Sequence, residues 1–275
     1  MRHFLTILFF LTGSCTFSQQ EPIFSQFWNA KTYYNPAMTG VGFKHLTTTI
    51  GRWQNVGVDG QPITQLLGYA LRSKKLHGGI GFTYLREEIG NSLFNKAKFN
   101  YSYHIATKKG GSISFGAGAG FNALKSSVAM PETNDAEGLG FTTDIGLTYA
   151  INKSSISLSC TQINSGRVTD AYSETPHLIL MSDYVFGQEN GIQLKPQVFV
   201  MTDFSDITFD VNALIMWKGK LGAGVTLRSN EDLSFSVNWD ILKKFRAGYA
   251  YDLVLGALSG QSKGSHTGFF GLVFR

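Results

Sequence analysis

Residues that could perform acid–base or metal chemistry are scattered along this chain. The histidines after His3 show no i, i+4 pair and no HExxH spacing, which are the patterns that bring two imidazoles to one metal. Glu87 and Glu88 adjoin in a segment expected to be a loop, where a solvated pair of charges is the simpler interpretation. Gly116–Gly120 reads GAGAG within an alternating segment and not before a helix, so it is no phosphate loop. We therefore expect no enzyme activity, no cofactor and no metal.

Seven charged residues stand at polar positions of segments that alternate between apolar and polar side chains. On the lipid face of a membrane barrel, a Lys or Arg near mid-bilayer would cost about 2–4 kcal/mol. We therefore expect these charges to face the lumen, where they either pair within a filled interior or line an ion-selective channel. They are Lys96, Lys98, Asp144, Asp210, Asp240, Arg246 and Asp252.

Two connections carry residue types that are favoured in protein recognition. Arg52 and Trp53 are of the types enriched at binding hot spots, and Asp59-Gly60 is typical of a tight turn. The longest connection, 122–139, combines acidic and apolar residues. The alternative is that these loops only shield the rim of a barrel. The predicted partner-binding residues are Arg52, Trp53, Asp59, Gly60, Met130, Glu132, Asp135 and Glu137.

The composition excludes several classes of protein. The chain has 275 residues, with 24 basic and 19 acidic side chains and a net charge of +5. Only 16% of the residues are charged, whereas glycine (31), phenylalanine (22) and tyrosine (11) are abundant. An ordinary domain has about 25% charged residues. This bias favours strands over helices. Because the basic residues form no Lys/Arg stripe, we expect no nucleic-acid partner.

The first 18 residues have the pattern of a secretory signal peptide. Met1–His3 is a short basic start, Phe4–Leu11 is an apolar run, and Thr16–Ser18 supplies small residues before a cleavage point. An alternative is that Cys15 carries a lipid anchor. Cleavage at the predicted point leaves Cys160 alone, so the mature chain can form no internal disulfide. The mature part has no run of 18 apolar residues, and no transmembrane helix is predicted.

Strict alternation of apolar and polar residues recurs along the rest of the chain. In residues 233–240, Leu, Phe, Val and Trp share one face, while Ser, Ser, Asn and Asp share the other. Such segments run to ten or twelve residues, longer than the usual strand of a soluble sandwich. They are typical of strands that cross an outer membrane. We predict an all-β fold, a transmembrane antiparallel up-and-down barrel of about 14 strands. They lie near 44–53, 62–72, 76–86, 93–105, 110–121, 140–151, 154–163, 175–186, 191–203, 206–217, 219–228, 232–241, 243–253 and 264–275.

The connections between these segments alternate in length. Outer-membrane barrels have short periplasmic turns and longer external loops, so both termini are expected on the periplasmic side. The predicted domains are a signal peptide at 1–18, a periplasmic N-terminal lead-in at 19–43 and an outer-membrane β-barrel at 44–275. The long connections follow odd-numbered segments and lie at Trp53–Gln61, Glu87–Ser92, Asn122–Leu139, Asn164–Glu174 and Val254–Lys263.

The lead-in contains residues that favour a turn. Pro36 keeps Asn35 extended, and Gly40 permits a reversal of the chain. We interpret these three residues either as a plain turn or as part of a docking segment for periplasmic partners.

Four stretches of the mature chain form a specific combination. They are QEPIFSQ at Gln20–Gln26, YNPAMTG at Tyr34–Gly40, RWQNVGVDGQP at Arg52–Pro62, and GYAYD at Gly248–Asp252 followed by Gly264–His266. This combination resembles the PorP/SprF family of type IX secretion membrane proteins, and the resemblance covers essentially the whole mature chain.

The resemblance implies a Bacteroidota outer-membrane barrel that works with the type IX secretion and gliding apparatus. Some members serve the secretion motor, whereas others are paired with large surface adhesins and support their export or attachment through a C-terminal domain. The expected partners are outer-membrane lipid, type IX subunits or the C-terminal domain of a secreted surface protein. The alternative from a different class is a passive porin with an open, water-filled lumen.

Overall fold

The strands of this chain close into an antiparallel barrel. The computed structural model describes residues 21–108, 110–127, 136–164, 168–169, 172–229, 232–242, 244–256 and 259–274. Its strands form one closed sheet in which each strand pairs with the next. The short β9 follows β8 and pairs with the same neighbouring strand, β10, so β8 and β9 together form one of the 14 strands around the barrel. The strands are β1 (His45–Trp53), β2 (Ile63–Ser73), β3 (Gly78–Ile89), β4 (Ser92–Ala106), β5 (Ser112–Ser126), β6 (Ala136–Ile151), β7 (Ser154–Thr161), β8 (His177–Tyr184), β9 (Phe186–Gly187), β10 (Ile192–Thr202), β11 (Ile207–Trp217), β12 (Leu221–Arg228), β13 (Leu233–Ile241), β14 (Phe245–Leu253) and β15 (Ser265–Phe274).

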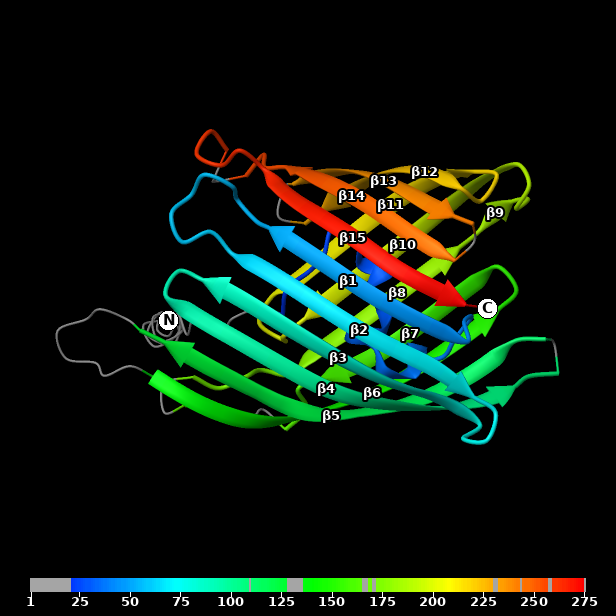
Figure 1. Cartoon of the computed structure of the whole chain (residues 1–275), viewed down its shortest axis with the longest axis horizontal. Coiled ribbons are helices and arrows are strands. Elements are labelled where there is room, and N and C mark those ends of the chain that lie inside the picture. Colours follow the sequence, from blue (N-terminus) through cyan, green and yellow to red (C-terminus); the bar gives the residue numbers. More distant parts are fainter. Residues whose placement is uncertain are drawn as a thin grey trace, which may run out of the picture.

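The first and last strands close the ring. β1 pairs with β15 along its whole length, from His45 opposite Phe274 to Trp53 opposite His266, and Figure 1 shows the two strands side by side in blue and red. We call the end where residues 54–62 join β1 to β2 the loop end. The end where residues 74–77 join β2 to β3 is the turn end, and the C-terminal residue of β15 lies there.

The alternation of side chains assigns the two faces of the wall. On β13, Phe235 and Val237 point outward with 47% and 56% of their surface exposed, whereas Ser234 and Ser236 face inward and are buried. Apolar side chains of the other strands line the outside in the same way, as Phe99 does on β4 and Phe115 does on β5. The predicted all-β membrane barrel of about 14 strands is confirmed.

Two of the predicted long connections are shorter than expected. Residues 87–92 form a hairpin with Gly90-Asn91 at its tip, because β3 and β4 stay paired up to Ile89 opposite Ser92 and Gly90 adopts a positive φ of 55°. Between β5 and β6, pairing continues to Ser126 opposite Ala136. The prediction of a loop over Glu87–Ser92 was therefore wrong, and that over 122–139 was too long.

The segment before β1 lies inside the barrel, as Figure 1 shows in dark blue. It contains η1 (Phe27–Asn29), α1 (Lys31–Tyr34) and η2 (Pro36–Met38). Its aromatic side chains are buried against the inner faces of the strands and form the main apolar core. The members of this core include Phe24, Phe27, Tyr33, Tyr34, Ile50, Leu85, Ile179 and Phe199. We call residues 21–43 the plug.

The plug runs through the lumen from one end to the other. Glu21 and Pro22 line a cavity at the loop end together with Gln54 and Pro62. Val41–Phe43 line another at the turn end, beside Asn152. The described residues of the predicted lead-in, 21–43, thus lie within the lumen, where their aromatic side chains are buried. Glu21 is at the end opposite to the C-terminal residue of β15.

Glycines of the wall make room for the plug. A Cβ on Gly116 of β5 would lie 2.1 Å from the backbone nitrogen of Ala37. A Cβ on Gly146 of β6 would lie 2.0 Å from Oδ1 of Asn35. Both distances are far inside van der Waals contact, so these two inward glycines permit the plug to touch the wall, through the backbone of Ala37 and the side chain of Asn35.

The helices of the described residues are three or four residues long. None is long and apolar enough to cross a membrane.

Candidate functional site

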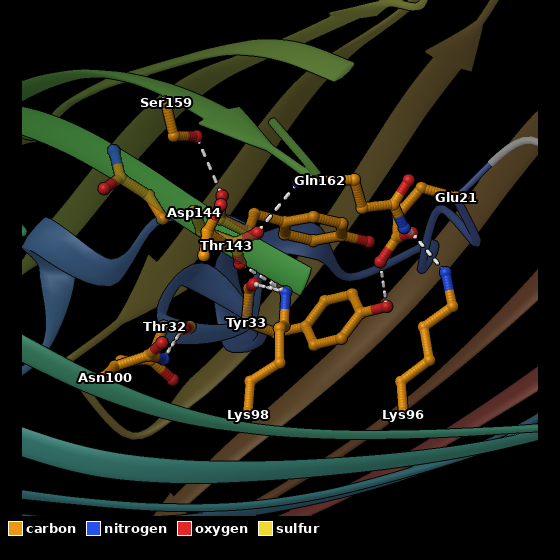
Figure 2. Close-up of polar contacts among 12 residues, drawn as sticks. Glu21, Thr32, Tyr33, Lys96, Lys98, Asn100, Thr143, Asp144, Ser159 and Gln162 are labelled. Carbon is orange, nitrogen blue, oxygen red and sulfur yellow. Dashed lines mark hydrogen bonds and ion pairs between the residues drawn. The ribbon is translucent and has the colours of Figure 1, made fainter. Parts of the chain in front are cut away.

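A network of buried charges joins the plug to the wall near the loop end (Figure 2). The ammonium group of Lys96 on β4 lies 2.8 Å from a carboxylate oxygen of Glu21 and 3.2 Å from one of Glu174. Nε2 of Gln162 donates to Glu21 at 2.7 Å, and the hydroxyl of Tyr33 donates to the same carboxylate. The first described residue of the plug is thus held by three side chains.

Lys98 makes a second link between wall and plug. Its Nζ lies 2.8 Å from Asp144 of β6, donates to the carbonyl oxygen of Tyr33 at 3.3 Å and stands 4.6 Å above the Tyr33 ring. Lys98 and Asp144 meet across β5, where a Cβ on Gly118 would approach Oδ1 of Asn100 to 2.6 Å. A glycine at this position therefore leaves space for the Asn100 side chain beside the ion pair.

Two arginines and two aspartates form a further group, the arginine cluster. Arg52 lies 2.8 Å from Asp252, and Arg228 lies 3.1 Å from both Asp252 and Asp210. The plug joins this cluster because Oγ of Ser25 donates to Asp252 at 2.8 Å. Nη2 of Arg228 also donates to the carbonyl oxygen of Ile23 at 3.2 Å.

The buried position of these pairs decides their role. Removing one partner of a buried ion pair leaves an uncompensated charge and costs about 3–5 kcal/mol. The carboxylates of Glu21, Asp144 and Asp252 are all almost completely buried. These buried pairs therefore join the plug to the wall.

The charges near the turn end are more exposed. Arg246 lies 3.5 Å from Asp240 on the neighbouring strand, and both side chains keep about a quarter of their surface exposed. Lys31 of the plug forms an ion pair with Asp183 of β8. All seven charges predicted to face the lumen thus have an opposite charge beside them.

The residues predicted for partner binding are dispersed by the fold. Arg52 does not lie on the loop surface as expected: at its position in β1 the side chain points inward, and it belongs to the arginine cluster. Trp53 points outward from the end of β1 and is 44% exposed. Asp59, Gly60 and Glu137 are exposed at the loop end. Met130, Glu132 and Asp135 lie outside the described residues.

The predicted turn residues of the lead-in are all buried in the lumen. Asn35 caps η2 by accepting from the backbone nitrogen of Ala37 at 2.8 Å, and its Nδ2 donates to the carbonyl oxygen of Leu158 at 3.2 Å. Pro36 starts η2, and Gly40 turns the chain with a φ of 79°. These residues shape the plug and are covered by the wall.

One connection of the loop end has a defined charge state. Burial alone would raise the pKa of Asp203, but the backbone N–H groups of Asp206 and Ser205 donate to its carboxylate at 2.8 and 3.0 Å and lower the pKa overall. The connection 203–206 therefore keeps a negative charge at the loop end.

Several residues of the buried network were not predicted from the sequence, Gln162 and Tyr33 among them. Arg228 occupies an inward position in the alternation of 221–228, and that pattern could have identified it as a lumen charge. Glu21, Ser25 and Glu174 belong to no alternating segment. The first two lie in the Gln20–Gln26 stretch of the family resemblance, but nothing in the sequence indicated that they are buried in the lumen. Among the described residues, no group of three or more His, Cys, Asp or Glu side chains could hold a metal ion.

The fold and the filled lumen define a class: this is an outer-membrane β-barrel whose interior is occupied by its own N-terminal segment. Residues 16–271 match the family described as type IX secretion system membrane protein PorP/SprF, so the chain belongs to that family. No curated protein matches the sequence.

Solved structures with a similar fold are bacterial outer-membrane barrels. The toluene transporter TbuX of Ralstonia pickettii is 11% identical with a TM-score of 0.61, covering 90% of this chain and 94% of its own. The monoaromatic hydrocarbon channel CymD is 10% identical with a TM-score of 0.55, covering 89% and 91%. Omp33 of Acinetobacter baumannii is 9% identical with a TM-score of 0.52, covering 86% and 100%. At such identities the similarity concerns the fold alone.

Proposed function

We propose that this barrel is a non-enzymatic outer-membrane component of the type IX secretion and gliding system. In this role it supports export or surface attachment of secreted adhesin-type cargo and contacts other type IX subunits. The observation that carries the proposal, together with membership of the family, is the filled lumen. A barrel that buries its own plug offers its two ends and its outer wall for contact, and no wide pore.

The proposed cargo contact is the loop end. Loops on a rigid barrel are well suited to recognition, since the scaffold fixes their positions. Asp59, Gly60 and Glu137 are exposed there, and the strands that the connection 128–135 joins end at the same rim. The proposed partner is the C-terminal domain of a secreted surface protein or a type IX subunit.

The proposed orientation puts the turn end in the periplasm. Short periplasmic turns and longer external loops are usual in this class of barrel. The signal peptide at 1–18 would direct export, and either its removal or lipidation of Cys15 would precede assembly.

Affinity capture from native membranes tests the cargo contact. The strands β5 and β6 remain paired up to Ser126 and Ala136, so residues 128–135 can be replaced by an Asn-Gly turn without shortening either strand. We expect this variant to assemble, as judged by its heat-dependent shift in electrophoretic mobility, and to lose the captured cargo. The control variant Asp203→Asn/Asp206→Asn changes another loop of the same end and should retain the cargo. An assembled deletion variant that captures cargo at the wild-type level would contradict the proposal for this loop.

The alternative of a passive porin predicts a different result. A porin reconstituted alone in a planar bilayer would conduct steadily, and deletion of its gene would leave surface cargo unchanged. The plugged barrel should show no steady conductance, and cells that lack it should lose cargo from their surface.

A further inference from the structure

Exposed lysines gather at the turn end of the barrel. Four of the tight turns at this end supply six of them, and every one is exposed to solvent. These are Lys74, Lys75, Lys153, Lys218, Lys220 and Lys244. Lys44, directly before β1, and Lys108, in the connection between β4 and β5, are exposed at the same end. We call these eight residues the lysine ring.

The ring surrounds the mouth of the barrel. Its members come from the connections that follow β2, β4, β6, β11 and β13 and from the start of β1, which are distributed around the closed sheet. Within the described residues of the turn-end connections, Glu189 is the one carboxylate. Asp183 and Asp240 at the strand ends form ion pairs with Lys31 and Arg246. The eight ammonium groups, with one carboxylate among the connections, therefore give this face a positive potential.

The mouth inside the ring is hollow. A cavity of about 360 Å³ opens there, lined by Phe43 of the plug and by Lys153 and Arg246 of the wall. The lysines therefore encircle a recess and can contact a partner that sits on the axis of the barrel.

The loop end has no such collection of lysines. The described residues of its connections include one lysine, Lys263. Among their carboxylates, Asp59 and Asp206 are exposed and Asp203 is half-buried, whereas Glu174 and Asp232 are buried. The modest net charge of +5 thus conceals an uneven distribution of lysines along the barrel axis.

We propose that the lysine ring is a docking surface for a soluble protein that presents an acidic face to the turn end. The partner is defined by charge complementarity, which steers association and fixes the orientation of a complex. That this partner is periplasmic follows only from the proposed orientation of the barrel. The binding of an acidic protein to the lysine ring does not depend on that orientation.

Anionic lipid is the competing occupant of such a ring. A membrane barrel meets lipid phosphates at both of its rims, so lysines that served only to contact lipid would be expected at both ends. The loop end, with one lysine in its described connections, departs from that expectation. In addition, the recess at the turn end lies inside the wall, where headgroups of the surrounding bilayer do not reach.

Binding of a defined acidic probe tests the proposal. The full mature chain is reconstituted in nanodiscs of phosphatidylcholine, and the affinity for fluorescent deca-glutamate is measured over a range of NaCl concentrations. We expect salt-sensitive binding, because screening weakens attraction between exposed charges. The variant Lys74→Gln/Lys75→Gln/Lys220→Gln/Lys244→Gln should bind about tenfold more weakly. The control Lys125→Gln/Lys263→Gln removes two exposed lysines of the loop end and should bind as the wild type does.

Three outcomes would overturn the proposal. The first is that the wild type shows no salt-sensitive binding of deca-glutamate, and the second is that the four-lysine variant binds it as tightly as the wild type. The third is that the Lys125→Gln/Lys263→Gln control loses as much affinity as the four-lysine variant. A second arm uses nanodiscs that contain phosphatidylglycerol. If the four-lysine variant loses enrichment of this lipid but keeps its affinity for deca-glutamate, the ring is a lipid contact and the proposal is wrong. Because the probe assay needs no cargo, its failure is distinguishable from failure of the proposed secretion role.

Discussion

The ammonium nitrogen of Lys96 lies 2.8 Å from a carboxylate oxygen of Glu21, which ties the plug at the loop end to strand β4. Both side chains are buried, and Glu174 approaches the same ammonium group at 3.2 Å. At the turn end, Lys31 and Asp183 join the plug to β8 in a more exposed setting. The two contacts hold the plug at opposite ends of the lumen, and the difference in burial predicts a difference in strength.

Replacing Lys96 should destabilise the barrel strongly. In Lys96→Met, Glu21 and Glu174 would remain buried without their shared cation, which should lower the free energy of unfolding by about 3–5 kcal/mol. Lys31→Met removes a partly exposed pair and should cost at most about 1 kcal/mol. Urea unfolding in detergent micelles measures both values. Equal losses in the two variants would show that burial of the Lys96 pair is not what stabilises the plug.

Adding a single methyl group to Gly116 should disturb the contact between wall and plug. The new Cβ of Gly116→Ala would meet the backbone nitrogen of Ala37 at 2.1 Å, and overpacking of this kind costs about 1–3 kcal/mol. Gly268→Ala on β15 is the matched control, because nothing lies within 4 Å of the Cβ built there. Urea unfolding should show a lower free energy of unfolding for Gly116→Ala and an unchanged one for Gly268→Ala. If Gly268→Ala were the more destabilising substitution, the plug would not contact β5 at Gly116.

A charge on the outer wall should impair assembly. Val237 faces outward in the middle of β13, so Val237→Arg would put a guanidinium group into lipid at a cost of about 2–4 kcal/mol. Val237→Leu keeps an apolar side chain at the same position and should assemble normally. The fraction of protein that shows the heat-dependent mobility shift of a folded barrel measures the effect. Normal assembly of the arginine variant would mean that this face does not contact lipid.

Removal of the plug should open the lumen. A chain without residues 21–40 keeps every strand and the pairing of β1 with β15, but it loses the buried aromatic side chains that fill the interior. We expect steady conductance in planar bilayers from this variant and none from the full mature chain. Heat-dependent mobility confirms that the shortened barrel is assembled. Conductance from the full chain would contradict a closed lumen.

The sequence by itself determined the architecture of the wall. Alternation with a period of two puts Phe235 and Val237 on one face and Ser234 and Ser236 on the other. Together with the length of the segments and the rhythm of short and long connections, this pattern indicates a wall with one face in lipid and one face inside. The same pattern identified the inward charges, since Lys98 and Asp144 occupy polar positions of their strands.

What fills the barrel was decided by the tertiary structure alone. The plug is too short and irregular for a periodic pattern, and the burial of Tyr33 and Phe24 depends on a cavity that exists only once β1 has met β15. The same holds for Arg52, which is predicted as a loop residue from the sequence but contacts Asp252, 200 residues later, across the neighbouring strand β15. Contacts between residues so distant along the chain form only when β1 pairs with β15 and closes the barrel. The local conformational preferences of the sequence carry no information about them.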